Sequence, residues 1–414
     1  MSAERLKILC VSQMPPSPPR FGAQARMHGL YTNLARHNEL TAVALVDDSF
    51  DLEDCRRAMQ AYCSEVVLLR NPRGAAGMAK RVLQLRSVAS TRSFERHLYS
   101  VAALQPALDS LLRRERFDLV DVEFPYLGHC NVRQSPPGTR PPLVVVDSHE
   151  IAYDMVRQFS RSGGALRRLY AGLDWRKLRR EELAAYGAAD GVLTCSAADA
   201  DRVRAEVPSA RTVVIPNAAD VEFYKPRPGD PPPDGRTLVF FGLLSTWPNI
   251  DGILFFLREI WPAIAAARPD ARLKVIGGRA PREVLQHAGP RVEMTGFVED
   301  LRPHLASAAA LVVPLRIGGG TRLKIVEGMA MSKAIVSTSL GAEGIDAVPG
   351  RDILIEDQPA AFAGAVLKLL GDPALAARMG QAGRKLAVER YSWSGAADAL
   401  ERFARDLMQT ARAA

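Results

Sequence analysis

Cysteine is scarce in this sequence of 414 residues, and the second half has none. The five that occur are Cys10, Cys55, Cys63, Cys130 and Cys195. Their scattered positions have neither the paired spacing of a zinc site nor the regular framework of a small disulfide-linked domain. We therefore expect cysteine to provide neither a metal centre nor cross-links.

Long apolar runs are also missing. No stretch is long enough to cross a bilayer, and the N-terminal segment MSAERLKILCVSQ enters a predicted strand without the pattern of a signal peptide. With 47% hydrophobic and 24% charged residues, the composition is typical of a globular protein, and 414 residues are too many for one compact core. We predict a cytoplasmic protein of two domains.

The most informative stretch is LVVPLRIGGGTRLKIVEGMAM, residues 311–331. It has neither a Walker Gly-Lys-Ser/Thr after its glycines nor GxGxxG spacing, but it joins an apolar strand to a helix start. Glycines let the backbone approach a ligand, and free N–H groups at a helix N-terminus favour an anion. Arg322 and Lys324 add cations, and Glu327 lies one turn beyond Lys324. We predict a site for a diphosphate and sugar hydroxyls; the alternative is an ordinary βα turn with an exposed Lys–Glu pair.

Positive charge is concentrated between Arg70 and Arg96. Seven cations stand there against Glu95 alone, 7 − 1 = +6: Arg70, Arg73, Lys80, Arg81, Arg86, Arg92 and Arg96. Val82, Leu83, Leu85 and Val88 lie among them. A membrane-surface amphipathic helix and a solvated helix face both fit this pattern, and both stay open. No nucleic-acid-binding module accompanies the charge, so we expect no nucleic-acid partner.

Apolar strands alternate with helical patterns along the whole chain, which predicts an α/β fold with mostly parallel sheets covered on both faces. Strands are expected at 6–11, 41–46, 66–69, 119–124, 143–147, 192–195, 213–215, 238–241, 273–276, 311–315 and 334–337. The proline-rich KPRPGDPPPDG lies in the predicted linker, 217–236, between domains 1–216 and 237–390. A C-terminal helix, 391–414, is expected to pack back on the first domain. We expect the ligand in the cleft between the domains, at the carboxyl ends of the strands.

Four segments occur in an order that resembles glycosyltransferase family 4, a family of retaining enzymes with the two-domain GT-B fold. They are VVIPNAADVEFYKP, VEMTGFVEDL, PLRIGGGTRLKIVEGMAMSKAIVST and ERYSW. The resemblance, closest to members with a GGGTR-type donor loop, implies two Rossmann-like domains. It also implies transfer of a hexose from a nucleoside diphosphate sugar to an acceptor hydroxyl on a glycan, a lipid-linked saccharide or a small molecule, without another cofactor. Polysaccharide or glycolipid biosynthesis is the implied setting, with or without peripheral contact with the inner face of the membrane.

The resemblance also assigns roles to residues around the glycine loop. Glu327 matches the second glutamate of the family's Glu-x7-Glu motif, which holds the ribose, whereas Gly319 replaces the first. Leu243 and Pro248 stand where many members carry the Arg and Lys that clasp the diphosphate. We interpret Arg322 and Lys324 as the relocated clasp, which makes the reaction independent of metal. A catalytically silent nucleotide-sugar-binding protein and a GT-B epimerase are the alternatives.

In the first domain, His149 follows the predicted strand 143–147 and matches the histidine that faces the transferred sugar in the family; a structural loop histidine is the alternative. Asp147 or Glu150 is a candidate to orient His149 or an acceptor hydroxyl. Because neighbouring strand residues point to opposite faces, at most one of the two carboxylates is expected to line the site with His149. Gly22 matches part of a glycine pair near the leaving phosphate, although Ala23 replaces the second glycine. Arg26 is expected either to reach an anionic group or to lie on the surface.

The remaining donor-binding candidates are mainly backbone positions in the second domain: Gly242, Gly277, Phe297, Val298, Gly318, Gly319, Gly320 and Thr321. Thr321 is expected to cap the helix that follows the glycines. No His or Asp cluster in the sequence indicates a metal site. Leu166, Leu169 and Leu173 recur at helical spacing in a strongly basic helix, 164–182. Docking on an anionic lipid surface and covering the first sheet are the two alternatives, and we expect the helix to cover the sheet.

Overall fold

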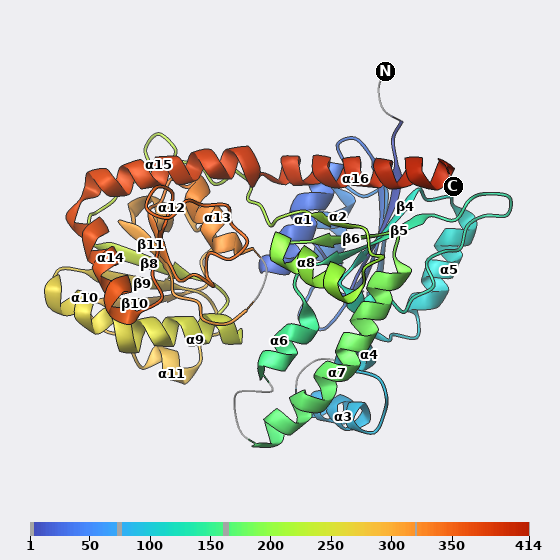
Figure 1. Ribbon diagram of the computed structural model, residues 1–414, viewed down its shortest axis with the longest axis horizontal. Coiled ribbons are helices and arrows are strands. Elements are labelled where there is room, and N and C mark those ends of the chain that lie inside the picture. Colours follow the sequence, from blue (N-terminus) through green and yellow to red (C-terminus); the bar gives the residue numbers. More distant parts are fainter. Residues whose placement is uncertain (1–3, 73–76, 160–164, 319–320, 414) are drawn as a thin grey trace. The chain divides into compact units, whose positions relative to one another are not determined.

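The computed structural model describes residues 4–72, 77–159, 165–318 and 321–413 (Figure 1). The chain forms two compact units. Unit 1 comprises residues Met1–Ile215 together with Ala396–Ala414, and unit 2 comprises Pro216–Gly395. The segment 217–236, predicted as a linker, therefore belongs to unit 2, where the amide of Asp234 donates to the carbonyl of Ser307 at 3.0 Å. Gly319 and Gly320 lie outside the described residues.

Unit 1 is built on a seven-stranded, fully parallel sheet in the order β3-β2-β1-β4-β5-β6-β7. The strands are β1 (Lys7–Ser12), β2 (Glu39–Val46), β3 (Glu65–Arg70), β4 (Leu119–Glu123), β5 (Leu143–Ser148), β6 (Gly191–Thr194) and β7 (Thr212–Val214). The central strands are mostly apolar because helices cover both faces, although β4 carries Asp121 and Glu123 and β5 carries Asp147. Chain order reverses at β1, so the ends of β1, β4 and β5 lie next to one another.

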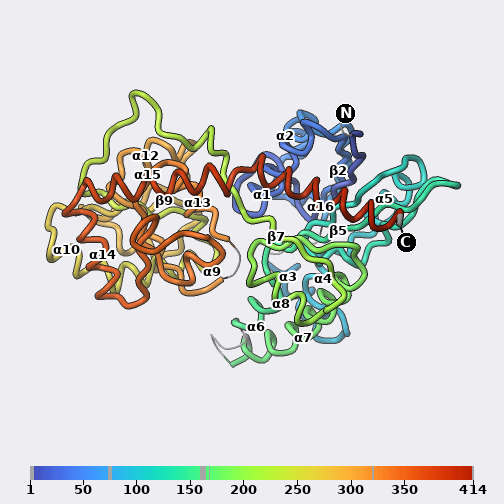
Figure 2. The backbone as a smooth tube through the Cα atoms, turned by 45° about the horizontal axis from the view of Figure 1, so that its top comes forward, coloured from blue at the N-terminus to red at the C-terminus, as the bar shows by residue number. Residues whose placement is uncertain are grey.

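The helices of unit 1 begin where side chains can cap them: Asp51, Ser93 and Ser196 each accept a hydrogen bond from an amide three residues later. The helices are α1 (Gly22–Leu34), α2 (Leu52–Gln60), α3 (Gly77–Val88), α4 (Phe94–Tyr99), α5 (Leu104–Arg114), α6 (Ala152–Phe159), α7 (Ala165–Ala188), α8 (Ala197–Glu206) and most of α16 (Trp393–Ala413), with a 3-10 turn at Pro125–Leu127. Both ribbon and tube views show α3, α4, α6 and α7 grouped together within this unit (Figures 1 and 2).

Unit 2 has a six-stranded parallel sheet in the order β10-β9-β8-β11-β12-β13. Its strands are β8 (Thr237–Phe241), β9 (Arg272–Ile276), β10 (Val292–Gly296), β11 (Ala310–Val313), β12 (Ile335–Ser337) and β13 (Leu354–Ile355). Alternate residues of β8 enter two different core clusters, Leu238 and Phe240 on one face and Val239 and Phe241 on the other. Both faces of the sheet are therefore buried, and the predicted fold class of two parallel-sheet α/β domains is confirmed.

The helices of unit 2 are α9 (Trp247–Phe255), α10 (Trp261–Ala267), α11 (Arg282–Leu285), α12 (Arg302–Ser307), α13 (Leu323–Ala330), α14 (Pro359–Gly371) and α15 (Pro373–Arg390). Between α9 and α10, a π-helical turn at Phe256–Ile260 interrupts the α-helical hydrogen bonding. Pro262, in the first turn of α10, explains the break because its ring nitrogen cannot donate to a preceding carbonyl.

No single described helix is long and apolar enough to cross a membrane. Only α14 and α15 together reach the required length and composition, and the chain bends by 103° between them. Three of their large apolar residues, Phe362, Leu370 and Met379, are buried in a core cluster of unit 2.

Candidate active site

The loop between β11 and α13 brings the guanidinium group of Arg322 back over its own backbone. Gly318 has a φ of 121°, which favours glycine, and a Cβ atom placed there would lie only 3.1 Å from Nη2 of Arg322. Arg322 is the N-cap residue of α13, without a side-chain capping bond. The prediction that Thr321 caps this helix is therefore wrong; Thr321 is buried, and its carbonyl accepts a hydrogen bond from Nδ2 of Asn217 at 2.8 Å.

Lys324 is fixed by groups that follow strand β8. Its Nζ atom donates to Oδ1 of Asn249 at 2.7 Å and lies 4.6 Å from the centre of the Phe240 ring. Asn249 in turn donates to the carbonyl of Leu243 at 3.0 Å, so the lysine is tied to the β8–α9 loop. Burial lowers the pKa of Lys324 to about 7, the charge of Arg322 adds to this effect, and Glu327 opposes it. A bound anion would stabilise the protonated form of this lysine. The environment of Lys324 therefore differs from that of the exposed lysine in the alternative prediction.

Glu327 follows on the next turn of α13, and its surroundings also favour the neutral form. Burial raises the pKa of Glu327 to about 7, while Lys324 and a hydrogen bond with Tyr224 oppose the rise. Arg322, Lys324 and Glu327 therefore form one cluster of charges in a poorly solvated place. Sequence reasoning missed Asn249 and Tyr224, because each joins the cluster from a segment distant in the chain.

Glycines allow two strand ends of unit 2 to approach each other closely. A Cβ atom on Gly277 would lie 2.0 Å from the carbonyl oxygen of Gly242, and one on Gly242 would lie 2.9 Å from Nδ2 of Asn249. Gly242 also has a φ of 152°. The amide of Gly242 donates to the carbonyl of Ile276 at 3.0 Å, which holds the two strand ends together beside the residue that binds Lys324.

Three further positions were predicted to bind the donor, Phe297 and Val298 in unit 2 and Gly22 in unit 1. The Phe297 side chain is 74% exposed, whereas Val298 is packed against a core cluster of unit 2. Gly22 is the first residue of α1 in unit 1, after Phe21, whose side chain makes no capping bond. The structure thus places Gly318 close to Arg322, and Gly242 close to Asn249, which binds Lys324. Phe297, Val298 and Gly22 remain candidates.

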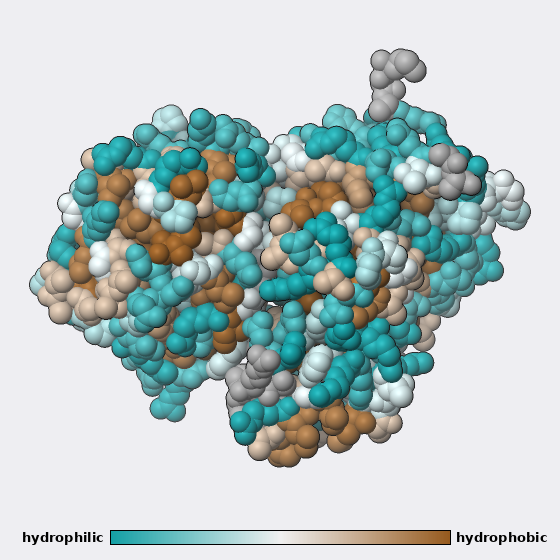
Figure 3. All heavy atoms as spheres, in the orientation of Figure 1, coloured by the Kyte–Doolittle hydropathy of each residue, from teal (hydrophilic) through white to brown (hydrophobic). Residues whose placement is uncertain are grey.

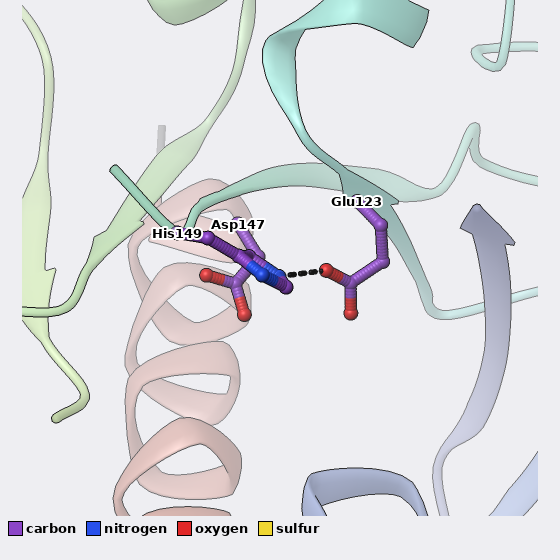
Figure 4. A group of neighbouring side chains, drawn as sticks. All are labelled: Glu123, Asp147 and His149. Carbon is purple, nitrogen blue, oxygen red and sulfur yellow. Dashed lines mark hydrogen bonds and ion pairs between the residues drawn. The ribbon is translucent and has the colours of Figure 1, made fainter. Parts of the chain in front are cut away.

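In unit 1, His149 lies just beyond β5, with its imidazole directed at Glu123 (Figure 4). Nε2 of His149 lies 2.6 Å from Oε2 of Glu123, whose Oε1 accepts a hydrogen bond from the Tyr31 hydroxyl at 2.6 Å. Phe124, with a φ of 62°, places its ring centre 4.0 Å from that of His149. Backbone strain of this kind is frequent at functional sites. Sequence reasoning missed Glu123. It could have been identified as a carboxylate at the end of β4, the strand that pairs with β5.

The His149–Glu123 contact is between groups that burial keeps neutral. Burial lowers the pKa of His149 to about 3; Asp147 opposes this change and Arg26 adds to it. Burial also raises the pKa of Glu123 well above its usual range, with Asp147 adding to the rise. The geometry therefore fits a carboxyl group that donates its proton to an uncharged imidazole.

Arg26 and Asp147 form a buried ion pair beneath this contact. Nε and Nη2 of Arg26 donate to the Asp147 carboxylate at 2.9–3.2 Å, and Nη1 donates to the carbonyl of Ile215 at 2.8 Å. Of the two expectations for Arg26, a surface position is wrong, because the side chain is fully buried; the anionic group that it reaches is the carboxylate of Asp147. The carboxylate on Nε2 of His149 belongs to Glu123, although Asp147 and Glu150 were the predicted candidates.

Glu123, Asp147 and His149 also bring three potential metal ligands within 4.8 Å of one another, a cluster that the sequence did not indicate. Their chemistry does not suit a cation. Arg26 already places a positive charge on Asp147, and Glu123 is held in its neutral form by burial. A metal ion would have to displace the guanidinium and ionise the carboxyl group, so we interpret the cluster as a hydrogen-bond network.

Comparisons with known proteins agree with the fold and the motifs. A model described as "Glycosyltransferase Family 4" matches residues 53–223, and one described as "Glycosyl transferases group 1" matches residues 235–372. Together these matches span most of both units. The chain belongs to the GT-B glycosyltransferases.

Solved GT-B structures resemble this glycosyltransferase over nearly its whole length. Sucrose-phosphate synthase from Thermosynechococcus elongatus has a TM-score of 0.71 at 18% identity, covering 98% of this chain and 100% of that one. HepE from Anabaena, solved with UDP and glucose, has a TM-score of 0.63 at 16% identity, covering 96% and 99%. At these identities the likeness shows the fold alone.

A curated relative is the GDP-mannose-dependent alpha-(1-6)-phosphatidylinositol monomannoside mannosyltransferase of Mycolicibacterium smegmatis. It is 27% identical over 210 residues, which are 45% of this GT-B chain and 54% of that protein. The matched stretches cover 35 to 54% of the curated relatives' lengths. Their activities and substrates therefore belong to them, and those of this chain are a matter for proposal.

Proposed function

We propose that this protein is a retaining glycosyltransferase that transfers a hexosyl group from a nucleoside diphosphate sugar to an acceptor hydroxyl. The observation that carries the proposal is the cluster at the start of α13. Arg322 and Lys324 stand there in a poorly solvated place at a helix N-terminus whose N-cap side chain makes no capping bond, with Glu327 one turn away. This set matches a diphosphate joined to a ribose. The cations would bind the diphosphate, and the carboxylate of Glu327 would accept hydrogen bonds from the ribose hydroxyls.

Charge develops on the leaving diphosphate as the bond to the sugar breaks. Arg322, Lys324 and the amides at the start of α13 are the groups that would stabilise it, each oriented before the reaction begins. Asn249 holds Lys324 in place for this role. Because two cations supply the positive charge, we expect transfer to continue in the presence of EDTA. No enzymic nucleophile is evident among the described residues, and we propose front-face transfer assisted by the leaving phosphate.

His149 is our candidate for the group that contacts a hydroxyl of the transferred sugar. With Nε2 accepting the proton of Glu123, the hydrogen of the neutral imidazole is on Nδ1, which can donate a hydrogen bond to that hydroxyl without adding charge. Replacing His149 by alanine should lower kcat for transfer more than it weakens binding of the free nucleoside diphosphate.

The relatives suggest the substrates to test first. HepE was solved with UDP and glucose, and the Mycolicibacterium relative is described as dependent on GDP-mannose. We therefore propose a UDP- or GDP-hexose as donor. A glycan or a lipid-linked saccharide is the proposed acceptor, in the synthesis of a polysaccharide or glycolipid.

A thermal-shift screen with UDP, GDP and their hexose conjugates should identify the donor, because a ligand that binds the native state raises Tm. Transfer is then measured with radiolabelled donor over an acceptor panel. Removing one oxyanion contact costs about 3 kcal/mol, so Arg322→Gln with Lys324→Gln should lower kcat/KM by a factor on the order of 10⁴. The control is Arg282→Gln with Arg378→Gln, which removes two exposed cations of unit 2.

Three results would contradict this proposal. The double variant at Arg322 and Lys324 could transfer sugar as fast as the control. The wild type could bind a donor without transfer to any acceptor, which would favour a silent binding protein. The wild type could also convert one nucleotide sugar into another with no acceptor present, as an epimerase does.

A further inference from the structure

Large apolar side chains are exposed together on two neighbouring helices of unit 1. Fourteen large hydrophobic residues of the described chain are exposed, and half of them belong to α3 and the first half of α7. We name these seven the α3–α7 patch: Met78, Val82, Leu85, Val88, Leu166, Leu169 and Leu173. Brown spheres gather over this end of unit 1 (Figure 3). Leu166, at 85% exposed, and Leu169, at 64%, do not cover the sheet. The predicted covering of the first sheet holds only for the later part of the helix, where Leu178 packs in the core cluster of unit 1.

Polar contacts hold the two helices against each other and direct the apolar side chains outward. Oγ of Ser87 on α3 donates to Oδ1 of Asp174 on α7 at 2.7 Å, and Nζ of Lys177 donates to the carbonyl of Ser87. Leu83, one turn before Ser87, is buried with it. The α3 face opposite Leu83 and Ser87 is therefore fixed in an exposed position, without a packing partner among the described residues.

The charge around the patch is positive. Lys80, Arg81 and Arg86 on α3 are exposed, as are Arg168 and Arg176 on α7. Residues 77–88 and 165–180 contain a single carboxylate, Asp174, which is buried and bound to Ser87. No carboxylate from these segments therefore neutralises the exposed cations.

We propose that the α3–α7 patch docks on the surface of an anionic lipid membrane. Lipid headgroups would bind the cations while the leucines and methionine enter the boundary between headgroups and acyl chains. A second copy of this chain fits less well, because two patches face to face would bring like charges together. The inference does not depend on the proposed function, since binding to a membrane requires neither a donor nor catalysis.

The test is co-sedimentation of the full chain with vesicles of phosphatidylcholine alone or mixed with phosphatidylglycerol, without any nucleotide. We expect binding to the mixed vesicles, weaker binding at high salt, and little binding to phosphatidylcholine alone. Each cation near an anionic surface contributes about 1 kcal/mol. Replacing Lys80, Arg81 and Arg86 by glutamine should therefore weaken binding on the order of a hundredfold.

The apolar part is tested separately with Leu85→Gln, Leu166→Gln and Leu169→Gln in one variant, which changes only exposed side chains. Weaker binding by roughly tenfold or more is expected for three leucines that would enter the interface. The matched control removes exposed apolar residues of unit 2, at Leu285, Val348 and Val388. The charge control replaces the exposed Arg36, Arg282 and Arg378 by glutamine.

The proposal would be overturned if the wild type ignored anionic vesicles, or if both patch variants bound them as well as their controls. It would also be overturned if sedimentation velocity showed a dimer that the leucine variant dissociates while vesicle binding is unchanged. Failure of the donor screen with intact vesicle binding would contradict the proposed function and leave the docking surface standing.

Discussion

Lys324 is held in an environment that disfavours its protonated form, and a bound diphosphate would favour that form instead. The ammonium group has the side chain of Asn249 and the face of Phe240 as its close neighbours, with Arg322 nearby. Its pKa of about 7 leaves it partly deprotonated at neutral pH. A doubly charged ligand in contact with Nζ raises this pKa, so that binding and protonation favour each other.

Binding of a nucleoside diphosphate should consequently take up a proton and weaken as pH rises. Between pH 8 and 9, Glu327, with a pKa of about 7, is already ionised, and Lys324 is the group that titrates. Affinity should fall by up to about tenfold over that pH unit. Calorimetry in buffers of different ionisation enthalpy measures the proton uptake directly. Lys324→Met should bind more weakly and lose both the uptake and the pH dependence; unchanged uptake in that variant would rule out Lys324 as the titrating group.

Single residues of the site were predictable only where they share one segment. Arg322, Lys324 and Glu327 lie within two turns of one helix, so their spacing places them together. The Glu123–His149 contact depends on β4 and β5 being neighbours in the sheet, which local patterns do not specify. Asn249 reaches Lys324 across 75 positions of sequence. Such long-range hydrogen bonds have no signature in spacing or composition.

At the scale of elements, the close approach of β8 and β9 is the feature most sensitive to a small change. Gly277→Ala would place a methyl group 2.0 Å from the carbonyl oxygen of Gly242, a backbone atom that cannot move aside cheaply. We expect unit 2 to lose about 1–3 kcal/mol of stability, and nucleotide binding to weaken because the β8–α9 loop shifts.

Gly364→Ala is the matched control, since it lies within α14 with nothing within 4 Å of the new methyl group. It should leave unit 2 unchanged or stabilise it by up to about 1 kcal/mol. Urea unfolding and a thermal shift with the identified nucleotide compare the two variants. Equal stability and equal binding would show that the strand ends have room for a side chain.

The elements themselves were largely predictable, because strands buried on both faces read as unbroken apolar runs. Strands β8 and β9 are examples, predicted within one residue of their observed bounds. Two features were not predicted. The strand β13 has two residues, too few for any periodicity, and the π-helical turn before Pro262 adds a residue to a turn without changing composition.

For the whole molecule, the important fact is that the last helix completes the unit that the first residues begin. Leu400, Ala404 and Leu407 of α16 are buried, and the ring of Phe403 occupies the space where a side chain at Gly191 would lie. Asn38 also donates to Glu401 at 2.9 Å. The C-terminal helix is therefore part of the structure of unit 1.

Deleting residues 396–414 should destabilise unit 1 by several kcal/mol, at about 1.5–3 kcal/mol for each large buried apolar side chain removed. Limited proteolysis should then cut unit 1 at lower temperature while unit 2 keeps its resistance. Deletion of 410–414 is the control, because the described side chains from Thr410 onward are exposed. Equal protection of unit 1 in both deletions would show that α16 is dispensable.

The same arrangement sets an order of events during synthesis. Unit 2 is one continuous stretch, Pro216–Gly395, and it is complete once the first three residues of α16 have been made. Unit 1 begins before unit 2 but lacks most of α16 until the residues after Gly395 have been made, so its seven-stranded sheet keeps an uncovered apolar strip while unit 2 folds. On the ribosome, unit 1 is therefore started before unit 2 and finished after it, and we expect unit 1 to bind chaperones longer.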